Sequence, residues 1–333
     1  MMKRRRWQAL VQFGLAVVLS IAVYAAAWAA PLSVPAPEQA VALKGQEKQA
    51  YMQQELQRLF DPQRKHHSFM VPDGWTWTKG QVGTVPVEQM TAEVKQTDRV
   101  LLQLHGGGYV LGLSNMNRLL GLRQGALIQA ASVYYADYRL APQHTYPAAL
   151  EDAVRVYRGL LEQGVAAEHI VVAGDSAGGN LAIALAVYVR DHHLPQPGAL
   201  ILQSPWADFE SASPSRTENA GKDLILGTGK PLSDEVVHPA YAGTMDLRDP
   251  RLSLVHADLS DLAPMLIQAG GHEVFLSECQ ALAAKAAADG TEVTLTVYPQ
   301  MPHDFVLLLP EMKESAYALL EIRDFVNRYV PGK

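Results

Sequence analysis

The chain has 333 residues, of which 48% are hydrophobic and 19% are charged, and its formal net charge is −6 at pH 7. This composition is that of a globular protein with a sizeable core, and the length suits one large domain. The slightly acidic balance, with no basic block after the N-terminus, argues against nucleic acid as a partner.

Residues 1–30 form the first predicted segment. Residues 3–6 are Lys-Arg-Arg-Arg, and residues 7–30 carry no charge. A positive start, an apolar run and small residues at Ala27 and Ala29 are typical of a secretory signal. The apolar run is also long enough to span a bilayer core of about 30 Å. We therefore expect an exported protein, periplasmic or secreted, whose N-terminal segment is either cleaved or retained as an inner-membrane anchor.

Residues 31–80 are expected to be a linker and a cap. The linker is the Pro-rich stretch "PLSVPAPEQA". Apolar residues at helical spacing then predict a helix within residues 47–60, as core packing would require. The aromatic stretch that follows, "FMVPDGWTWTKG", is interpreted as a loop.

Residues 81–333 are expected to be one α/β domain. Apolar runs predict strands at 99–105, 132–140, 169–174, 199–204, 264–270 and 291–299. Helical patterns lie between or after them, at 119–130, 148–163, 179–192, 277–289 and 311–330. Continuous apolar strands that alternate with helices indicate a mostly parallel sheet covered on both faces. The Ser-, Thr-, Gly- and Pro-rich segment 208–250 is interpreted as an excursion near the ligand edge of the sheet.

A Gly-x-Ser-x-Gly pattern follows the third of these strands. It reads Gly174-Asp175-Ser176-Ala177-Gly178, and a helical pattern begins directly after it. In that context the glycines allow a tight strand-to-helix turn with an exposed serine at its tip. A helix N-cap is the alternative role for the serine. The rest of the chain favours Ser176 as a nucleophile.

A glycine run follows the first predicted strand, in "LLQLHGGGYVLG". Beyond His105, the N–H groups of Gly106, Gly107 and Gly108 are free to approach a substrate oxygen, together with that of Ala177. The alternative is a flexible glycine turn. We expect an oxyanion hole here.

The acid and the base of such a site follow the serine in sequence. Glu273 comes just after one predicted strand end and His303 just after the next. Because the carboxyl ends of parallel strands share one edge, both should meet Ser176 there. His303 would act as the base, and Glu273 would orient it. Glu278 and Asp304 remain rival acids.

Other chemistry has little support. The histidine pairs at 66–67 and 192–193 do not share a helix face, so a metal site is not expected. The single cysteine, Cys279, excludes an internal disulfide framework and reads as a small buried residue within a helix. No cofactor is expected.

The motifs together resemble those of the bacterial hormone-sensitive-lipase-like esterases of the α/β-hydrolase superfamily. The matching stretches are "HGGGYVLG", "DYRLAPQHTYPAALEDA", "VVAGDSAGGNLA", "LQSPWAD", "DLAPMLIQAGGHEVFLSE" and "YPQMPHDFVLL". The resemblance implies an α/β-hydrolase fold with an N-terminal helical cap, and it makes Gly107 and Gly108 the oxyanion donors. By the same analogy, four aromatic residues are candidate pocket walls, with simple core packing as the alternative for each: Trp75, Trp77, Tyr109 and Trp206.

Two positions depart from the family pattern. Many members have Asp-Pro-Leu where this chain has Glu273-Val274-Phe275, which weakens the assignment of the acid. The family's His-Gly-Phe is His303-Asp304-Phe305 here. The added carboxylate is expected to raise the pKa of the base.

We therefore expect a serine carboxylesterase that hydrolyses small to medium acyl esters through an acyl-enzyme. Lactone, carbamate or amide hydrolysis on the same triad is one alternative, since the fold hosts many activities. A non-catalytic binder, as the plant gibberellin receptors are, is the other, although those lack the catalytic histidine. The expected partner is a small ester substrate. Membrane contact is expected through the N-terminal anchor alone, and homodimer formation is left open.

Overall fold

The computed structural model describes residues 36–61, 63 and 68–332, so the predicted export segment lies outside the described residues. Eight strands form one sheet in the order β1-β2-β4-β3-β5-β6-β7-β8. Their bounds are β1 Trp75–Val82, β2 Val85–Ala92, β3 Val100–Leu104, β4 Ser132–Ala136, β5 Ile170–Asp175, β6 Ala199–Gln203, β7 Met265–Gly270 and β8 Val293–Tyr298.

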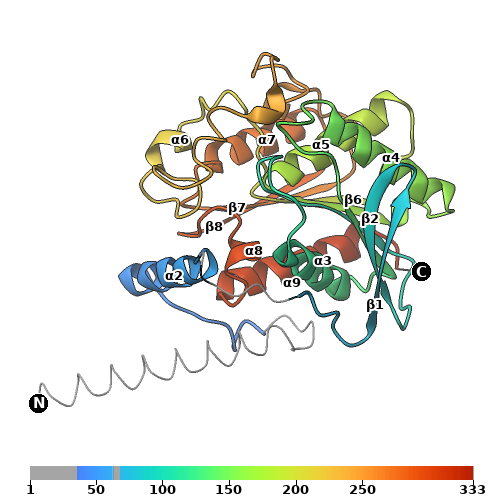
Figure 1. Ribbon diagram of the computed structural model, residues 1–333, viewed down its shortest axis with the longest axis horizontal. Helices are drawn as coiled ribbons and strands as arrows, with labels where there is room; N and C mark the ends of the chain where they lie inside the picture. Colours follow the sequence, from blue (N-terminus) through green and yellow to red (C-terminus); the bar gives the residue numbers. More distant parts are fainter. Residues whose placement is uncertain (1–35, 62, 64–67, 333) are drawn as a thin grey trace, which may run out of the picture.

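Helices cover both faces of this sheet. In Figure 1, α3, α8 and α9 lie below it, and α4, α5 and α7 lie above it. The helices are α2 Gly45–Leu59, α3 Asn115–Leu127, α4 Ala148–Glu162, α5 Ala177–Asp191, α6 Ser215–Glu218, α7 Leu276–Ala288, α8 Phe305–Leu308 and α9 Lys313–Tyr329, with 3₁₀ turns at Ala167–His169, Ala240–Ala242 and Leu254–His256. The chain thus has the predicted α/β architecture.

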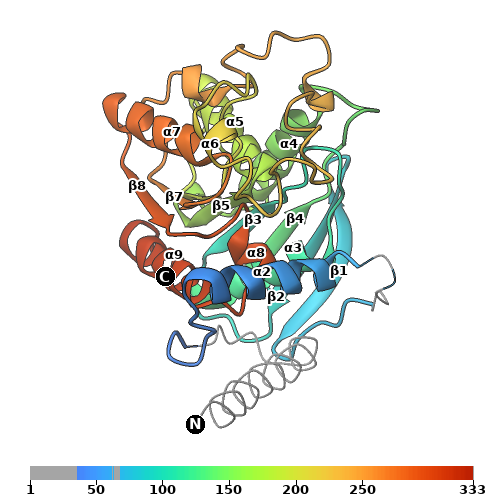
Figure 2. The ribbon, with the colours of Figure 1, turned by 90° about the vertical axis from the view of Figure 1, so that its left-hand side faces the viewer.

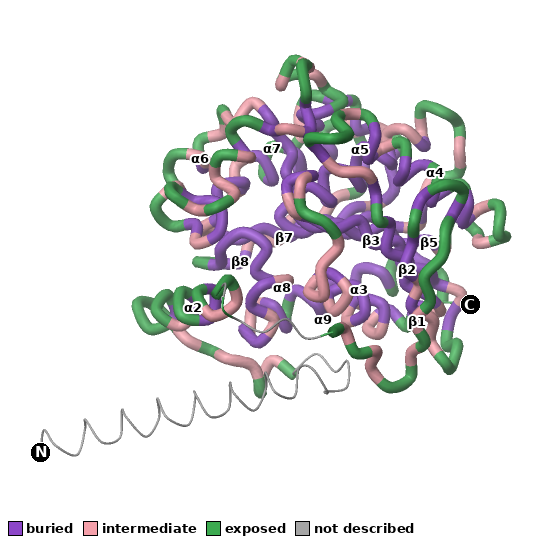
Figure 3. Tube along the Cα trace, viewed as in Figure 1, coloured by how far each residue is buried: buried purple, intermediate pink, exposed green. Residues whose placement is uncertain are grey.

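The six predicted strands are confirmed as β3 to β8, and they pair in parallel from β4 across to β8. Every residue of β3, β4, β5, β6 and β7 is buried, as continuous apolar runs require. Figure 3 shows this buried centre between helices whose outer sides are exposed. Since these strands are parallel, β3, β5, β6, β7 and β8 all end at one edge of the sheet.

The aromatic stretch predicted to be a loop is instead the start of a hairpin. β1 and β2 pair antiparallel, and β2 continues antiparallel to β4, so the hairpin extends the sheet. Gly83, at φ 59°, lies in the two-residue turn between them, where glycine is favoured. Most of β1 is exposed or half-buried, and this polar edge explains why its sequence looked like a loop. The expected domain boundary at residues 80 and 81 falls inside β1.

Helix α2 is the predicted N-terminal helix, and it docks beside the carboxyl edge of the sheet. The Lys48 ammonium, 3% exposed, donates to Pro299 O (3.1 Å), which directly follows β8, and to Glu314 (2.6 Å). In Figure 2, α2 crosses the side of the molecule that faces the viewer. No helix in the described ranges combines the length and apolar character needed to cross a bilayer.

Candidate active site

Ser176 lies at the tip of a sharp turn between β5 and α5. Its backbone adopts φ 53° and ψ −119°, a strained conformation for a residue with a side chain. The turn is closed by glycines: a Cβ on Gly174 would lie 2.1 Å from Gly178 O, and a Cβ on Gly178 would lie 2.0 Å from Leu104 O. The predicted tight strand-to-helix turn is therefore confirmed, but the predicted exposure of the serine is wrong, because Ser176 is only 6% exposed.

Gly178→Ala is expected to lower the free energy of unfolding by about 1–3 kcal/mol, since the added methyl group meets a backbone carbonyl that cannot rotate away. Denaturant unfolding measures the change. Gly80→Ala is the matched control, because nothing lies within 4 Å of a Cβ at Gly80. It should alter stability by no more than about 0.5 kcal/mol. Equal stability of both variants would contradict this account of the turn.

His303 meets Ser176 as the sequence predicts. It follows the end of β8, is 2% exposed, and its Nε2 lies 2.9 Å from Ser176 Oγ. The Phe275 ring packs edge-on against the imidazole, with ring centroids 4.8 Å apart. These contacts hold the ring where it can accept the serine proton.

The three candidate acids occupy different positions. Glu273 Oε2 lies 3.9 Å from His303 Nδ1, whereas Asp304 Oδ2 lies 3.2 Å from Nε2, the nitrogen that faces Ser176. Glu278 instead pairs with Arg216 (2.9 Å) and accepts a hydrogen bond from Ala207 N–H. Only an acid at Nδ1 leaves Nε2 free for the serine, so among these three the geometry favours Glu273 for orienting the base.

Glu273 is not yet hydrogen-bonded to His303. Its Oε2 accepts a hydrogen bond from the Ser204 hydroxyl (2.6 Å), and His303 Nδ1 has no hydrogen-bond partner among the described residues. Catalytic hydrogen bonds are often long without substrate and tighten in the complex. Ser204, at the end of β6, was not predicted as a site residue. Nothing in its local sequence signals a contact with a residue 69 positions away.

Burial and neighbouring charges shift the pKa values of this group. Burial alone lowers the pKa of His303, but the Asp304 and Glu273 carboxylates outweigh it and raise the pKa to about 9. Burial raises the pKa of Glu273 to about 8, against the opposing effect of His303. Burial likewise raises the pKa of Asp175, with Asp304 adding to the effect. The protonation of Glu273, His303 and Asp175 is therefore set by burial and by the charges of their neighbours.

The glycine loop after β3 lies against the serine turn. Gly107 and Gly108 have φ 113° and 64°, and in the described part of the chain no hydrogen bond from their N–H groups, or from that of Ala177, is found. These three donors are available for an oxyanion. Gly106 is a correction, because its N–H donates to Asp175 Oδ2 (3.0 Å) and is already used.

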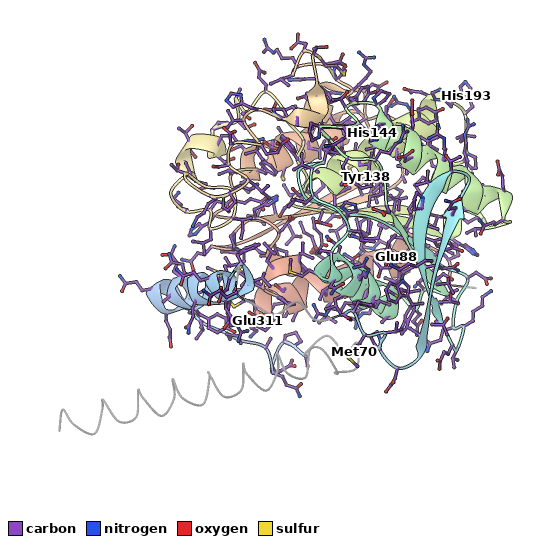
Figure 4. The ribbon with its side chains drawn as sticks, in the orientation of Figure 1. Met70, Glu88, Tyr138, His144, His193 and Glu311 are labelled. Atoms are coloured by element: carbon purple, nitrogen blue, oxygen red, sulfur yellow. The ribbon has the colours of Figure 1, made fainter. Side chains whose placement is uncertain are left out.

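The remaining motif residues support this loop. A Cβ on Gly106 would lie 2.3 Å from Asp175 Oδ2, so glycine lets the carboxylate come close. His105 stacks on Tyr138 at 4.3 Å, and the Tyr138 hydroxyl donates to His105 O (2.5 Å). Figure 4 labels Tyr138 near the middle of the molecule. Burial lowers the pKa of His105 to about 4, so it is a neutral structural residue.

The four aromatic residues that were candidate pocket walls have two kinds of surroundings. Trp75 and Trp77 lie on β1, four strand spacings or about 19 Å from β5. Tyr109 and Trp206 are close to the site and 1% and 0% exposed, so both side chains are packed in the core. Tyr109 instead donates to Asn180 Oδ1 (2.7 Å), and Trp206 N–H donates to Ser176 O (3.0 Å). Core packing, the alternative to a pocket wall, describes Tyr109 and Trp206, which lie behind the serine turn.

Asp208, Glu210 and His256 are the described side chains that come closest to a metal-ligand set, with one ligand atom of each within 4.8 Å of the others. However, Asp208 already accepts hydrogen bonds from Glu210 N–H (2.9 Å) and the Ser213 hydroxyl (3.2 Å). His256 and its neighbours are partly open to solvent, where acidic groups often gather without an ion. We assign no metal to this cluster.

The chain is similar in sequence and fold to known hydrolases. Residues 101–307 match the family described as the alpha/beta hydrolase fold. The chain is 39% identical to an acetyl-hydrolase of Streptomyces hygroscopicus over 71% of this chain and 79% of that one. It is 33% identical to an esterase of Acinetobacter venetianus over 72% and 78% of the two chains. A solved esterase of the bacterial hormone-sensitive lipase family superposes with a TM-score of 0.78 at 31% identity, covering 87% of this chain and 100% of that one.

Proposed function

This chain belongs to the bacterial hormone-sensitive-lipase-like esterases of the α/β-hydrolase fold and is a carboxylic ester hydrolase, and we propose that it acts as a serine esterase through an acyl-enzyme. The observation that carries the proposal is the 2.9 Å contact between Ser176 Oγ and His303 Nε2 at the strained turn. A nucleophile in hydrogen-bond reach of its base is the requirement for this chemistry.

In the first half-reaction, Ser176 Oγ attacks the ester carbonyl carbon while its proton passes to His303 Nε2. The negative charge moves to the carbonyl oxygen, where the N–H groups of Gly107, Gly108 and Ala177 stabilise it. The carbon–oxygen bond to the alcohol then breaks, and His303 returns the proton to the leaving oxygen. Glu273 stabilises the imidazolium that exists between these steps.

In the second half-reaction, water replaces the alcohol. His303 takes a proton from the water as its oxygen attacks the acyl carbon, and the same oxyanion donors stabilise the charge. The bond to Ser176 Oγ breaks and the serine recovers its proton, which releases the acid. The chain's own residues supply every proton acceptor and donor in this cycle.

We further propose small to medium acyl esters as the substrates. Two relatives support short acyl groups: one is named an acetyl-hydrolase, and crystals of a solved esterase, 32% identical, were soaked with p-nitrophenyl butyrate. In this chain, Leu111 lies beside Gly107 and is 51% exposed, so it offers apolar surface at the mouth of the site.

Hydrolysis of p-nitrophenyl esters from acetate to laurate tests this function. We expect the highest kcat/KM on short chains. A pre-steady-state burst of p-nitrophenol should accompany each ester whose acyl-enzyme is hydrolysed more slowly than it forms. Labelling with a fluorophosphonate, followed by peptide mass mapping, should modify Ser176. Folded protein that shows neither turnover, nor a burst, nor labelling would contradict the proposal.

A further inference from the structure

A buried carboxylate from outside the motifs binds the main chain on both sides of the catalytic group. Asp223 lies in the long connection between β6 and β7 and is 2% exposed. Its Oδ2 accepts a hydrogen bond from Val274 N–H (2.9 Å), directly after Glu273. Its Oδ1 lies 3.5 Å from His303 N and accepts from Ile225 N–H (2.9 Å). One side chain therefore links the loop of the acid to the loop of the base.

Two neighbours of Asp223 bind the same acid loop. The Asn219 amide donates to Glu273 O (2.9 Å). The Ser215 hydroxyl donates to Val274 O (2.7 Å) and accepts from Ser277 N–H (2.9 Å). All three side chains are buried, so these hydrogen bonds replace water at main-chain groups that would otherwise be unsatisfied. We call Ser215, Asn219 and Asp223 the clasp.

The clasp binds the two loops that carry Glu273 and His303, and the reaction requires these two side chains to come closer together. Glu273 Oε2 and His303 Nδ1 are 3.9 Å apart, about 1 Å beyond a hydrogen bond. Both side chains are buried, with exposed fractions of 0% and 2%, so neither can move far toward the other by changing its rotamer. The relative position of the two backbones therefore decides whether the pair closes when the imidazole becomes charged.

We propose that Asp223 is a positioning residue that sets the distance between Glu273 and His303 by holding both loops through their backbone N–H groups. The inference rests on the proposed acyl-enzyme mechanism and deepens it. Asp223 touches neither Ser176 nor the oxyanion donors, so it acts through the acid and the base. Its charge is also one of those that face His303, together with Asp304, Glu273 and Asp175.

The test is Asp223→Asn in the full-length protein. Asparagine has nearly the same shape as aspartate, but one carboxylate oxygen becomes an NH₂ group. That group cannot accept a hydrogen bond, so the N–H of Val274 or of His303 loses its acceptor. We expect kcat for p-nitrophenyl butyrate to fall about tenfold to a hundredfold, the cost of a misplacement near 1 Å. KM should change less than threefold. The pKa on the acidic limb of kcat/KM should fall, because one carboxylate facing the base is lost.

Asp246→Asn is the matched control. Asp246 lies in the same connection and accepts a hydrogen bond from the N–H two residues on, Arg248 (3.0 Å), as Asp223 does from Ile225. It is exposed and touches neither catalytic loop. This variant should keep the wild-type kcat and pH profile.

Asn219→Ala is the second variant in case Asp223→Asn does not fold. It removes the bond to Glu273 O without removing a charge, so we expect a fall in kcat of about threefold to tenfold with an unchanged pH profile. Wild-type kcat in Asn219→Ala, or wild-type kcat and pH profile in folded Asp223→Asn, would overturn the positioning role. Ser176-dependent turnover and labelling of wild-type protein, measured alongside, keep that result distinct from failure of the mechanism itself.

Discussion

Replacing Ser176 with alanine is expected to lower kcat for p-nitrophenyl butyrate by about a millionfold, with little change in stability. The serine oxygen forms the covalent bond in the proposed mechanism, and no other described hydroxyl lies within hydrogen-bond distance of His303 Nε2. Alanine keeps the Cβ that the strained backbone already accommodates. Steady-state kinetics and fluorophosphonate labelling on the purified variant measure the loss, and thermal unfolding checks the fold.

Ser260→Ala is the control for this substitution. Ser260 lies before β7, at the opposite edge of the sheet from the carboxyl ends, so the variant should retain wild-type turnover and labelling. A folded Ser176→Ala protein that still hydrolyses the ester at a tenth of the wild-type rate would show that another group is the nucleophile. Residual burst kinetics in that variant would lead to the same conclusion.

Ser176 and His303 can be predicted because each lies next to a recognisable sequence pattern: glycines flank the serine, and a predicted strand precedes the histidine. The serine turn needs residues without a Cβ at Gly174 and Gly178, and the oxyanion loop needs positive φ at Gly107 and Gly108. Parallel strands with apolar runs then fix where distant loops meet, since their carboxyl ends share one edge. The successive pairings of β5, β6, β7 and β8 put the ends of β5 and β8 at one edge, and the loop after β8 carries His303 to Ser176.

The rest depends on contacts that leave no periodic pattern. The Ser204 hydroxyl and the Asp223 carboxylate reach partners 51 to 80 residues away through single hydrogen bonds. Gly106 belongs to the glycine run that predicts the oxyanion donors. In the structure, however, glycine is needed at this position because Asp175 packs against it. The sequence does not predict β1, because an edge strand with a polar face resembles a loop in composition.

The second large effect concerns Asp304, one of the two positions that depart from the family pattern. His303 must be neutral to accept the serine proton, and Asp304 Oδ2, 3.2 Å from its Nε2, stabilises the charged form. With the pKa of His303 raised to about 9, kcat/KM should rise with pH through neutrality and level off only above that value. At pH 7 about 1% of the imidazole would be neutral. Wild-type protein is therefore expected to be an alkaline esterase.

Asp304→Asn and Asp304→Gly should both move the acidic limb of the kcat/KM profile down by about one to three pH units. Both residues tolerate the left-handed backbone at this position, where φ is 51°, so the fold should be retained. Turnover at pH 6 to 7 should then exceed that of wild type at the same pH. Stopped-flow or plate assays of p-nitrophenyl acetate between pH 5 and 10 measure the shift, with Asp258→Asn as the control at an exposed carboxylate.

The sign of the result separates two roles for Asp304. A charge that only stabilises the imidazolium raises the pKa of the base, so its removal speeds the reaction at low pH and changes the alkaline plateau little. An acid that orients the base would be needed at every pH, so its removal would lower the plateau by orders of magnitude. Glu273→Gln is expected to show that second behaviour. If Asp304→Asn shows it instead, the orienting acid is Asp304, and the 3.9 Å separation between Glu273 and His303 is then the resting distance of a pair that never closes.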